Sequence, residues 1–135
     1  MHDIHWIAVI VATAASFVIG GLWYSPLLFA KVWQREAVLS EEQIQGTNMP
    51  KIFGGAFVLT FLGVLVLSYF IEPGEGLDNL HHGAALGFHV GLFWVAGSLG
   101  VNYLFERRSF RLWLINGGYN VVTYTIAGLI LAAMI

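Results

Sequence analysis

Four long stretches without a single Asp, Glu, Lys or Arg constrain the fold of this chain more than any other feature. Within the 135 residues they cover positions 4–30, 52–71, 79–105 and 112–135. The hydrocarbon core of a bilayer is about 30 Å thick and takes roughly 20 helical residues to cross, so each stretch is long enough to span it. Backbone amides in hydrocarbon must bond within their own segment, and the stretches lack the alternating polarity of membrane strands. We therefore expect four transmembrane helices.

The composition fits a surface that faces lipid. Apolar residues make up 58% of the chain and charged residues 10%, against about 45–50% and about 25% in soluble proteins. The chain has no cysteine, which excludes disulfides and thiolate sites, and it has no basic patch that favours nucleic acid. The predicted architecture is an all-α, integral membrane four-helix bundle that forms a single domain over residues 1–135. Its spans are expected at about 4–28, 52–71, 80–105 and 112–135.

The basic residues predict the orientation of the spans. The second loop and the amino-terminal tail contain none of them, whereas the second loop is acidic. Because basic loops face the cytoplasm, we expect both termini to lie outside it. The six basic residues, in the first and third loops, are Lys31, Arg35, Lys51, Arg107, Arg108 and Arg111.

The first loop contains a helix signal of its own. Ser40, with Gln43 three residues later, forms a capping-box pattern that predicts a short helix ending near Gly46. Trp33 and Leu39 give the same segment apolar side chains. We expect a short interfacial helix on the membrane surface.

Small residues repeat at four-residue spacing in two of the spans. Such stripes let helix backbones approach closely, and van der Waals contact then drives association in lipid. We interpret them as packing surfaces within the bundle, with a pore wall or a homo-oligomer face as the alternatives. The stripes are Ala8, Ala12, Ser16 and Gly20 in the first span and Gly83, Gly87 and Gly91 in the third.

Histidines offer the sharpest polar chemistry. His5, His81 and His82, with His2, lie near acidic residues at the outer ends of spans one and three, and imidazole with carboxylate suits zinc or another divalent ion. Exposed interfacial histidines that bind nothing are the alternative. His89 lies two turns inside span three, where an ionisable group is a candidate proton relay or haem ligand. A neutral imidazole hydrogen-bonded across the bundle is its alternative explanation.

Amide and hydroxyl groups gather toward the cytoplasmic side of three spans. In hydrocarbon these groups should face the bundle interior, where they pair with one another or bind a small polar ligand or lipid headgroup. Interhelical hydrogen bonds and a ligand site are both open interpretations. The residues concerned are Tyr24, Ser25, Asn102, Asn116 and Asn120.

A faint internal echo connects two of these segments. Gly21-Leu22-Trp23-Tyr24 resembles Gly100-Val101-Asn102-Tyr103, and both lie at the cytoplasmic end of an odd-numbered span. Such an echo fits two parallel helical hairpins related by an axis along the membrane normal. Chance similarity between two aromatic-rich membrane exits is the alternative.

Three segments carry a resemblance to a known family. They are Trp6 through Trp23-Tyr24-Ser25-Pro26, then Asn102-Tyr103-Leu104-Phe105-Glu106, then Leu112-Trp113-Leu114-Ile115-Asn116-Gly117-Gly118-Tyr119. In this order the chain resembles a small bacterial membrane family catalogued only as a domain of unknown function. The resemblance implies a four-span protein of the bacterial inner membrane, and it brings no known activity or site residue.

Several function classes remain open on the sequence alone. No nucleophile–base pair, phosphate loop or nucleotide fingerprint is present, so we do not favour an enzyme. We expect a non-enzymatic binding or accessory component among membrane lipids, acting as a homo-oligomer or within a larger membrane complex. A minimal channel or carrier for a small solute is the first alternative, and a haem- or metal-binding redox protein is the second. The sequence identifies no cofactor.

Overall fold

The computed structural model describes residues 3–135, and helices make up 80% of the chain. Over those residues it contains no strand. Four helical segments are long and apolar enough to cross a membrane, which confirms the predicted all-α membrane bundle. The segments are α1 (Trp6–Trp23), α4 (Met49–Ser68), the third span (Gly76–Glu106) and α7 (Phe110–Met134).

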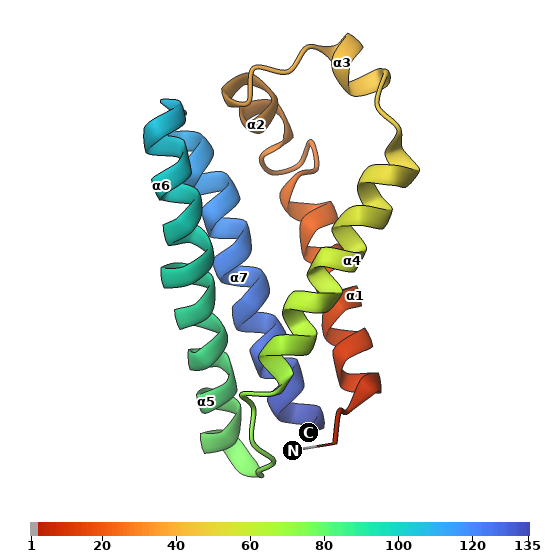
Figure 1. Cartoon of the computed structure of the whole chain (residues 1–135), viewed down its shortest axis with the longest axis vertical. Coiled ribbons are helices and arrows are strands. Elements are labelled where there is room, and N and C mark those ends of the chain that lie inside the picture. The colour runs from red at the N-terminus through yellow and green to blue at the C-terminus, as the bar shows by residue number, and fades with distance from the viewer. Residues whose placement is uncertain (1–2) are drawn as a thin grey trace.

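The last helix, α7, is the centre of the bundle. It packs along the third span on one side and along α1 on the other, while α4 packs mainly on α1. Figure 1 shows both termini and the turn between α4 and α5 at one end of the molecule, and the first loop at the opposite end. The core of buried side chains lies toward the terminal end, where Val9, Val64 and Leu131 are almost fully enclosed.

Glycines bring the third span and α7 into backbone contact. A β-carbon built at Gly83 would lie 2.5 Å from the carbonyl oxygen of Gly128, and one built at Gly87 would overlap the carbonyl oxygen of Tyr124. At Gly91 the nearest atom would be the α-carbon of Val121, 2.9 Å away. No side chain fits between the two helices at these positions. The glycine stripe of the third span therefore faces α7 of the same chain.

The first-span stripe is also enclosed. Ala8, Ala12 and Ser16 are buried, and the Ser16 hydroxyl donates back to the Ala12 carbonyl at 2.9 Å. A β-carbon at Gly20 would meet the Tyr119 hydroxyl at 3.2 Å, so this glycine lies against α7.

The third span is not a continuous α-helix, although its uninterrupted apolar sequence predicted one. It consists of α5 (Gly76–His89), a π-helical segment η1 (Val90–Ala96) and α6 (Gly97–Glu106). π-Helices, with bonds between residues five apart, are rare and occur mostly as single-turn bulges within α-helices. At the end of this one, the Trp113 indole N–H of α7 donates to the Ala96 carbonyl at 2.8 Å.

The first loop holds two short helices where the sequence predicted one. The predicted helix is α3 (Glu41–Gln45), and both bonds of its capping box are present, at 3.1 and 2.9 Å between Ser40 and Gln43. The additional helix is α2 (Ala30–Glu36). It follows a turn at Pro26, which ends α1 at Trp23 instead of near residue 28, because the residue before a proline is driven out of the helical region.

Candidate functional site

Three helices, α1, α6 and α7, meet at a cluster of tyrosines and asparagines near the first loop. The Tyr24 hydroxyl donates to the Asn116 side-chain oxygen at 2.7 Å, and the Asn116 amide nitrogen donates to the Tyr103 hydroxyl at 2.8 Å. The Asn120 amide donates to the Asn116 backbone carbonyl at 2.8 Å. We call Tyr24, Tyr103, Asn116, Tyr119 and Asn120 the tyrosine–asparagine cluster. It joins α1, α6 and α7 through one central side chain.

Aromatic contacts surround these bonds. The Tyr24 ring meets the Tyr119 ring edge-on at 5.3 Å between centroids and the Trp33 ring of α2 at 5.9 Å. Next to it, the Trp23 indole N–H donates to the Ile115 carbonyl at 2.9 Å. The end of α1 is thus held to α7 by side-chain hydrogen bonds as well as by the close contact at Gly20.

Two predicted members of the polar set lie outside the cluster. Asn102 is exposed on α6, and the neighbouring Tyr103 occupies the inward position instead. The Ser25 hydroxyl donates to the Leu22 carbonyl at 2.7 Å within its own turn. The internal echo in the sequence pointed to the role of Tyr103. It pairs Tyr24 with Tyr103, and the hydroxyls of both bond Asn116.

Protein groups occupy both ends of the Asn116 side chain. Its oxygen accepts one bond and its amide nitrogen donates another, so each end of the group has a tyrosine as partner. A polar ligand that replaced either bond would have to displace a tyrosine. The geometry therefore matches interhelical hydrogen bonding more closely than an open site.

The two basic loops also meet at this end. Arg35 and Glu36 of α2 form an ion pair at 3.5 Å. The Ser109 hydroxyl, which hydrogen-bonds the Glu36 carboxylate, lowers the pKa of Glu36, and the nearby Arg35 and Arg111 lower it further. An ionised Glu36 thus links the first loop to the residues just before α7.

The predicted metal ligands are not assembled. His5 caps α1, because its Nδ1 accepts a bond from the Ala8 amide at 3.1 Å, and His81 and His82 are exposed on α5. Across residues 3–135, no three His, Asp or Glu side chains lie close enough together to hold a metal ion. His2 lies outside the described residues.

His89 lies on the outside of the bundle, not in its interior. It follows Gly87 by two positions, which places it on the opposite side of the helix from the α7 contact. Its Nδ1 lies 2.6 Å from the Ala85 carbonyl, and its ring lies beside those of Phe88 and Phe93. A bond across the bundle is one explanation that the sequence allows for His89, whereas the bond that the structure shows lies within α5.

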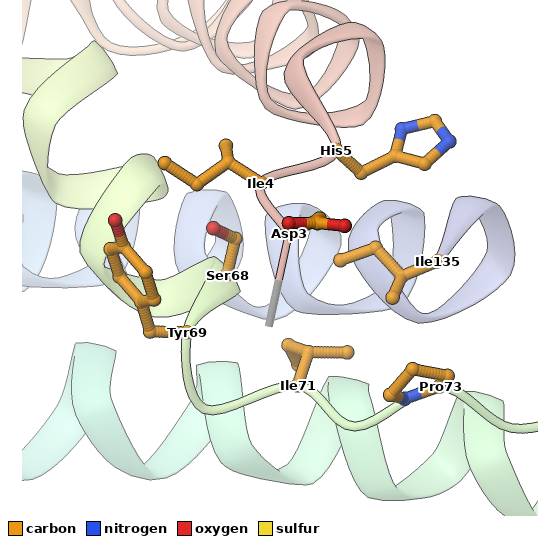
Figure 2. A pocket seen from close by; sticks show the side chains of 8 residues that line it. All are labelled: Asp3, Ile4, His5, Ser68, Tyr69, Ile71, Pro73 and Ile135. Atoms are coloured by element: carbon orange, nitrogen blue, oxygen red, sulfur yellow. The ribbon is translucent and has the colours of Figure 1, made fainter. Parts of the chain in front are cut away.

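A pocket of about 250 Å³ opens at the end that carries both termini. Figure 2 shows the Asp3 carboxylate near its middle, whereas the His5 imidazole points away from it. Ser68 and Tyr69, at the end of α4, contribute hydroxyl groups. The Ser68 hydroxyl already donates to the Leu65 carbonyl at 2.6 Å. The pocket lining offers few polar side chains, and it contains one acidic side chain, Asp3, and no Lys or Arg.

A second cavity, about 390 Å³ in volume, lies between α4 and the third span over the surface of α7. We call it the lateral groove. Its walls are aliphatic and aromatic, and the hydroxyl of Tyr124 and the indole of Trp94 are the polar side-chain groups in the lining. Sequence reasoning missed this groove, because it arises from the separation of α4 from the third span. The lining residues are Leu62, Gly63, Val66, Leu67, Phe70, Val90, Trp94, Val95 and Tyr124.

Comparison with known families matches residues 7–132 to one described as a protein of unknown function, DUF1761. The chain belongs to the DUF1761 family. The match covers all four spans and confirms the resemblance seen in the sequence. No curated protein and no solved structure matches this DUF1761 chain.

Proposed function

We propose that this DUF1761 protein is a non-enzymatic membrane protein that takes an apolar molecule from the bilayer into the lateral groove. The observation that supports this most directly is the groove itself, about 390 Å³ in volume and lined almost wholly by apolar side chains. Its volume falls within the range of about 300–1,000 Å³ that is usual for small-molecule sites. Because it lies beside spanning helices, a ligand can enter it from lipid without crossing a polar surface.

The other polar features give less support to a solute site. The tyrosine–asparagine cluster bonds its own members, so transport through it would require those bonds to break. For that reason we rank the channel or carrier hypothesis second.

Photolabelling tests groove binding. The purified protein, in vesicles, is irradiated with a fatty acid that carries a diazirine at the end of its chain. The expected labels lie on the groove walls, and Val66→Trp should remove them by filling the space. Val58→Trp is the matched control, since Val58 lies on the same helix with 54% exposure against 55% for Val66 but outside the groove. Labels spread evenly over every lipid-facing helix, in both variants, would contradict the proposal.

Self-association through the outer face of the third span is a second proposal, and His89 favours it. By the helical rise, His89 lies about 20 Å along the span from Gly76, well inside the hydrocarbon core. One ring nitrogen bonds Ala85, and the other faces outward, where lipid offers no partner. An unpaired polar group in an apolar medium is costly. A second copy of the chain packed on this face would enclose the imidazole and supply a partner.

Counting bleaching steps of labelled protein in vesicles tests self-association. His89→Leu should convert multiple steps into single ones, whereas His82→Leu, at an exposed position of the same helix near the membrane surface, should not. Unchanged step counts in His89→Leu would contradict the proposal. A Soret absorption band that is lost in His89→Leu would favour the haem-binding alternative instead.

A further inference from the structure

Two polar groups line the lateral groove without a hydrogen-bond partner. Within residues 3–135, the indole N–H of Trp94 and the hydroxyl of Tyr124 donate to no atom of the protein. Trp23 and Trp113 donate to backbone carbonyls, and Tyr24 donates to Asn116. Four other aromatic donors in residues 3–135 are also unpaired, but they lie in the first loop or within one turn of the end of a span: Trp6, Trp33, Tyr69 and Tyr103. Trp94 and Tyr124 differ from them because they lie far from the span ends.

Both groups lie too deep for water or lipid headgroups to satisfy them. At 1.5 Å per residue, Tyr124 is about 21 Å from the start of α7 and about 15 Å from its end. Trp94 is about 18 Å from the end of α6 by the same measure. These depths fall inside the hydrocarbon core, and the ester carbonyls of phospholipids lie outside it, in the interfacial layer. A plain acyl chain in the groove would leave both donors unpaired, at a free-energy cost.

Two local features of the chain position these donors, the π-helical segment and a glycine on α4. The π-helical segment carries Trp94, which is 67% exposed to the groove and to lipid, and π-turns are frequent at functional sites. On α4, Gly63 leaves room for the Tyr124 hydroxyl, since a β-carbon there would lie 2.5 Å from that oxygen. A larger residue at position 63 would displace the hydroxyl.

We infer that the ligand of the groove is a quinone, that is, a flat ring bearing carbonyl oxygens on an apolar tail. This inference rests on the groove binding proposed above. Carbonyl oxygens accept hydrogen bonds from an indole N–H and a phenol O–H. The ring can stack on the aromatic side chain of Trp94 or Tyr124, while the aliphatic wall of Leu62 and Val66 contacts the tail. A membrane alcohol fits less well, because its hydroxyl is drawn to the interface rather than to this depth.

Competition binding tests the acceptor chemistry separately from the groove. A tritiated quinone with a decyl tail is bound to the purified protein, and unlabelled decylbenzene, which has a flat ring and the same tail but no oxygen, competes with it. Because a hydrogen bond contributes a roughly 3- to 10-fold gain in affinity, decylbenzene should need at least a roughly 10-fold higher concentration than unlabelled quinone. Equal competition by the two would overturn the quinone inference while groove binding stands.

Substitutions of Trp94 and Tyr124 test whether each of these donors bonds the quinone. Trp94→Phe and Tyr124→Phe should each weaken quinone binding by roughly 3- to 10-fold and leave decylbenzene binding unchanged. Phe88→Leu, on the outer face of the third span and outside the groove, is the control and should bind as the parent does. Wild-type affinity in both donor variants would overturn the inference. Absence of saturable quinone binding, with photolabelling of the groove retained, would overturn it too, whereas loss of both signals would overturn the proposed function itself.

Discussion

Gly87 of α5 packs directly on the backbone of Tyr124 in α7. A β-carbon at Gly87 would overlap the Tyr124 carbonyl oxygen and lie 2.7 Å from its carbonyl carbon. The obstacle is main chain, which cannot turn aside as a side chain can. At this contact no side chain separates the backbones of α5 and α7. The contact also positions the Tyr124 side chain, which belongs to the lateral groove.

Gly87→Ala should destabilise the bundle, because its methyl group can be accommodated only if α5 and α7 move apart. Overpacking of this kind costs about 1–3 kcal/mol. Gly54→Ala is the matched control, since nothing lies within 4 Å of a β-carbon at Gly54. Unfolding by denaturant in mixed micelles measures both changes. Equal stability of Gly87→Ala and the parent would show that the two helices do not meet here.

The tyrosine–asparagine cluster gives a second prediction. Asn116→Leu removes the bonds to Tyr24 and Tyr103, and interhelical bonds in membranes contribute roughly 0.6–2 kcal/mol. Asn102→Leu, on the exposed side of α6, should leave the free energy of unfolding almost unchanged. The same unfolding experiment compares the two variants. A larger loss in Asn102→Leu than in Asn116→Leu would contradict the inward placement of Asn116.

The Gly63 contact predicts a coupling between helix packing and the groove. Gly63→Ala should push the Tyr124 hydroxyl aside, at a small cost in stability because the obstacle is the far end of a side chain. Quinone binding should weaken as it does in Tyr124→Phe. Gly55→Ala, in open space on the same helix, is the control for both measurements. Unaltered quinone binding in Gly63→Ala would show that ligand affinity does not depend on the position of the Tyr124 hydroxyl.

Much of the fold could be predicted because its causes are local in the sequence. Charge-free stretches indicate spans, since hydrocarbon excludes charge wherever the helix packs. Ser40 and Gln43 indicate a helix start because their bonds connect residues three apart. The four-residue spacing of Gly83, Gly87 and Gly91 places them on one face, although spacing alone does not say which helix that face meets.

The parts that could not be predicted depend on contacts between distant residues. Asn102 and Tyr103 are adjacent, and only the rotation of α6 against α7 decides which faces Asn116. The π-helical segment before Gly97 ends at the Ala96 carbonyl, which accepts a bond from Trp113, a donor 17 residues away. The lateral groove follows from the separation of two spans, and apolar composition looks the same whether a helix faces lipid, a groove or another helix.

The six basic residues support a proposed orientation in a bacterial inner membrane, with both termini outside the cytoplasm, and cysteine labelling tests it. The chain has no native cysteine, so single substitutions report one site each. We choose Glu41→Cys in the first loop and Glu75→Cys in the second, both exposed. Gly76 is avoided because its φ of +83° would strain a cysteine. In intact cells an impermeant thiol reagent should label position 75 and spare position 41 until the membrane is broken. Labelling of position 41 from outside, with position 75 protected, would reverse the orientation and place the His5 end of the bundle in the cytoplasm.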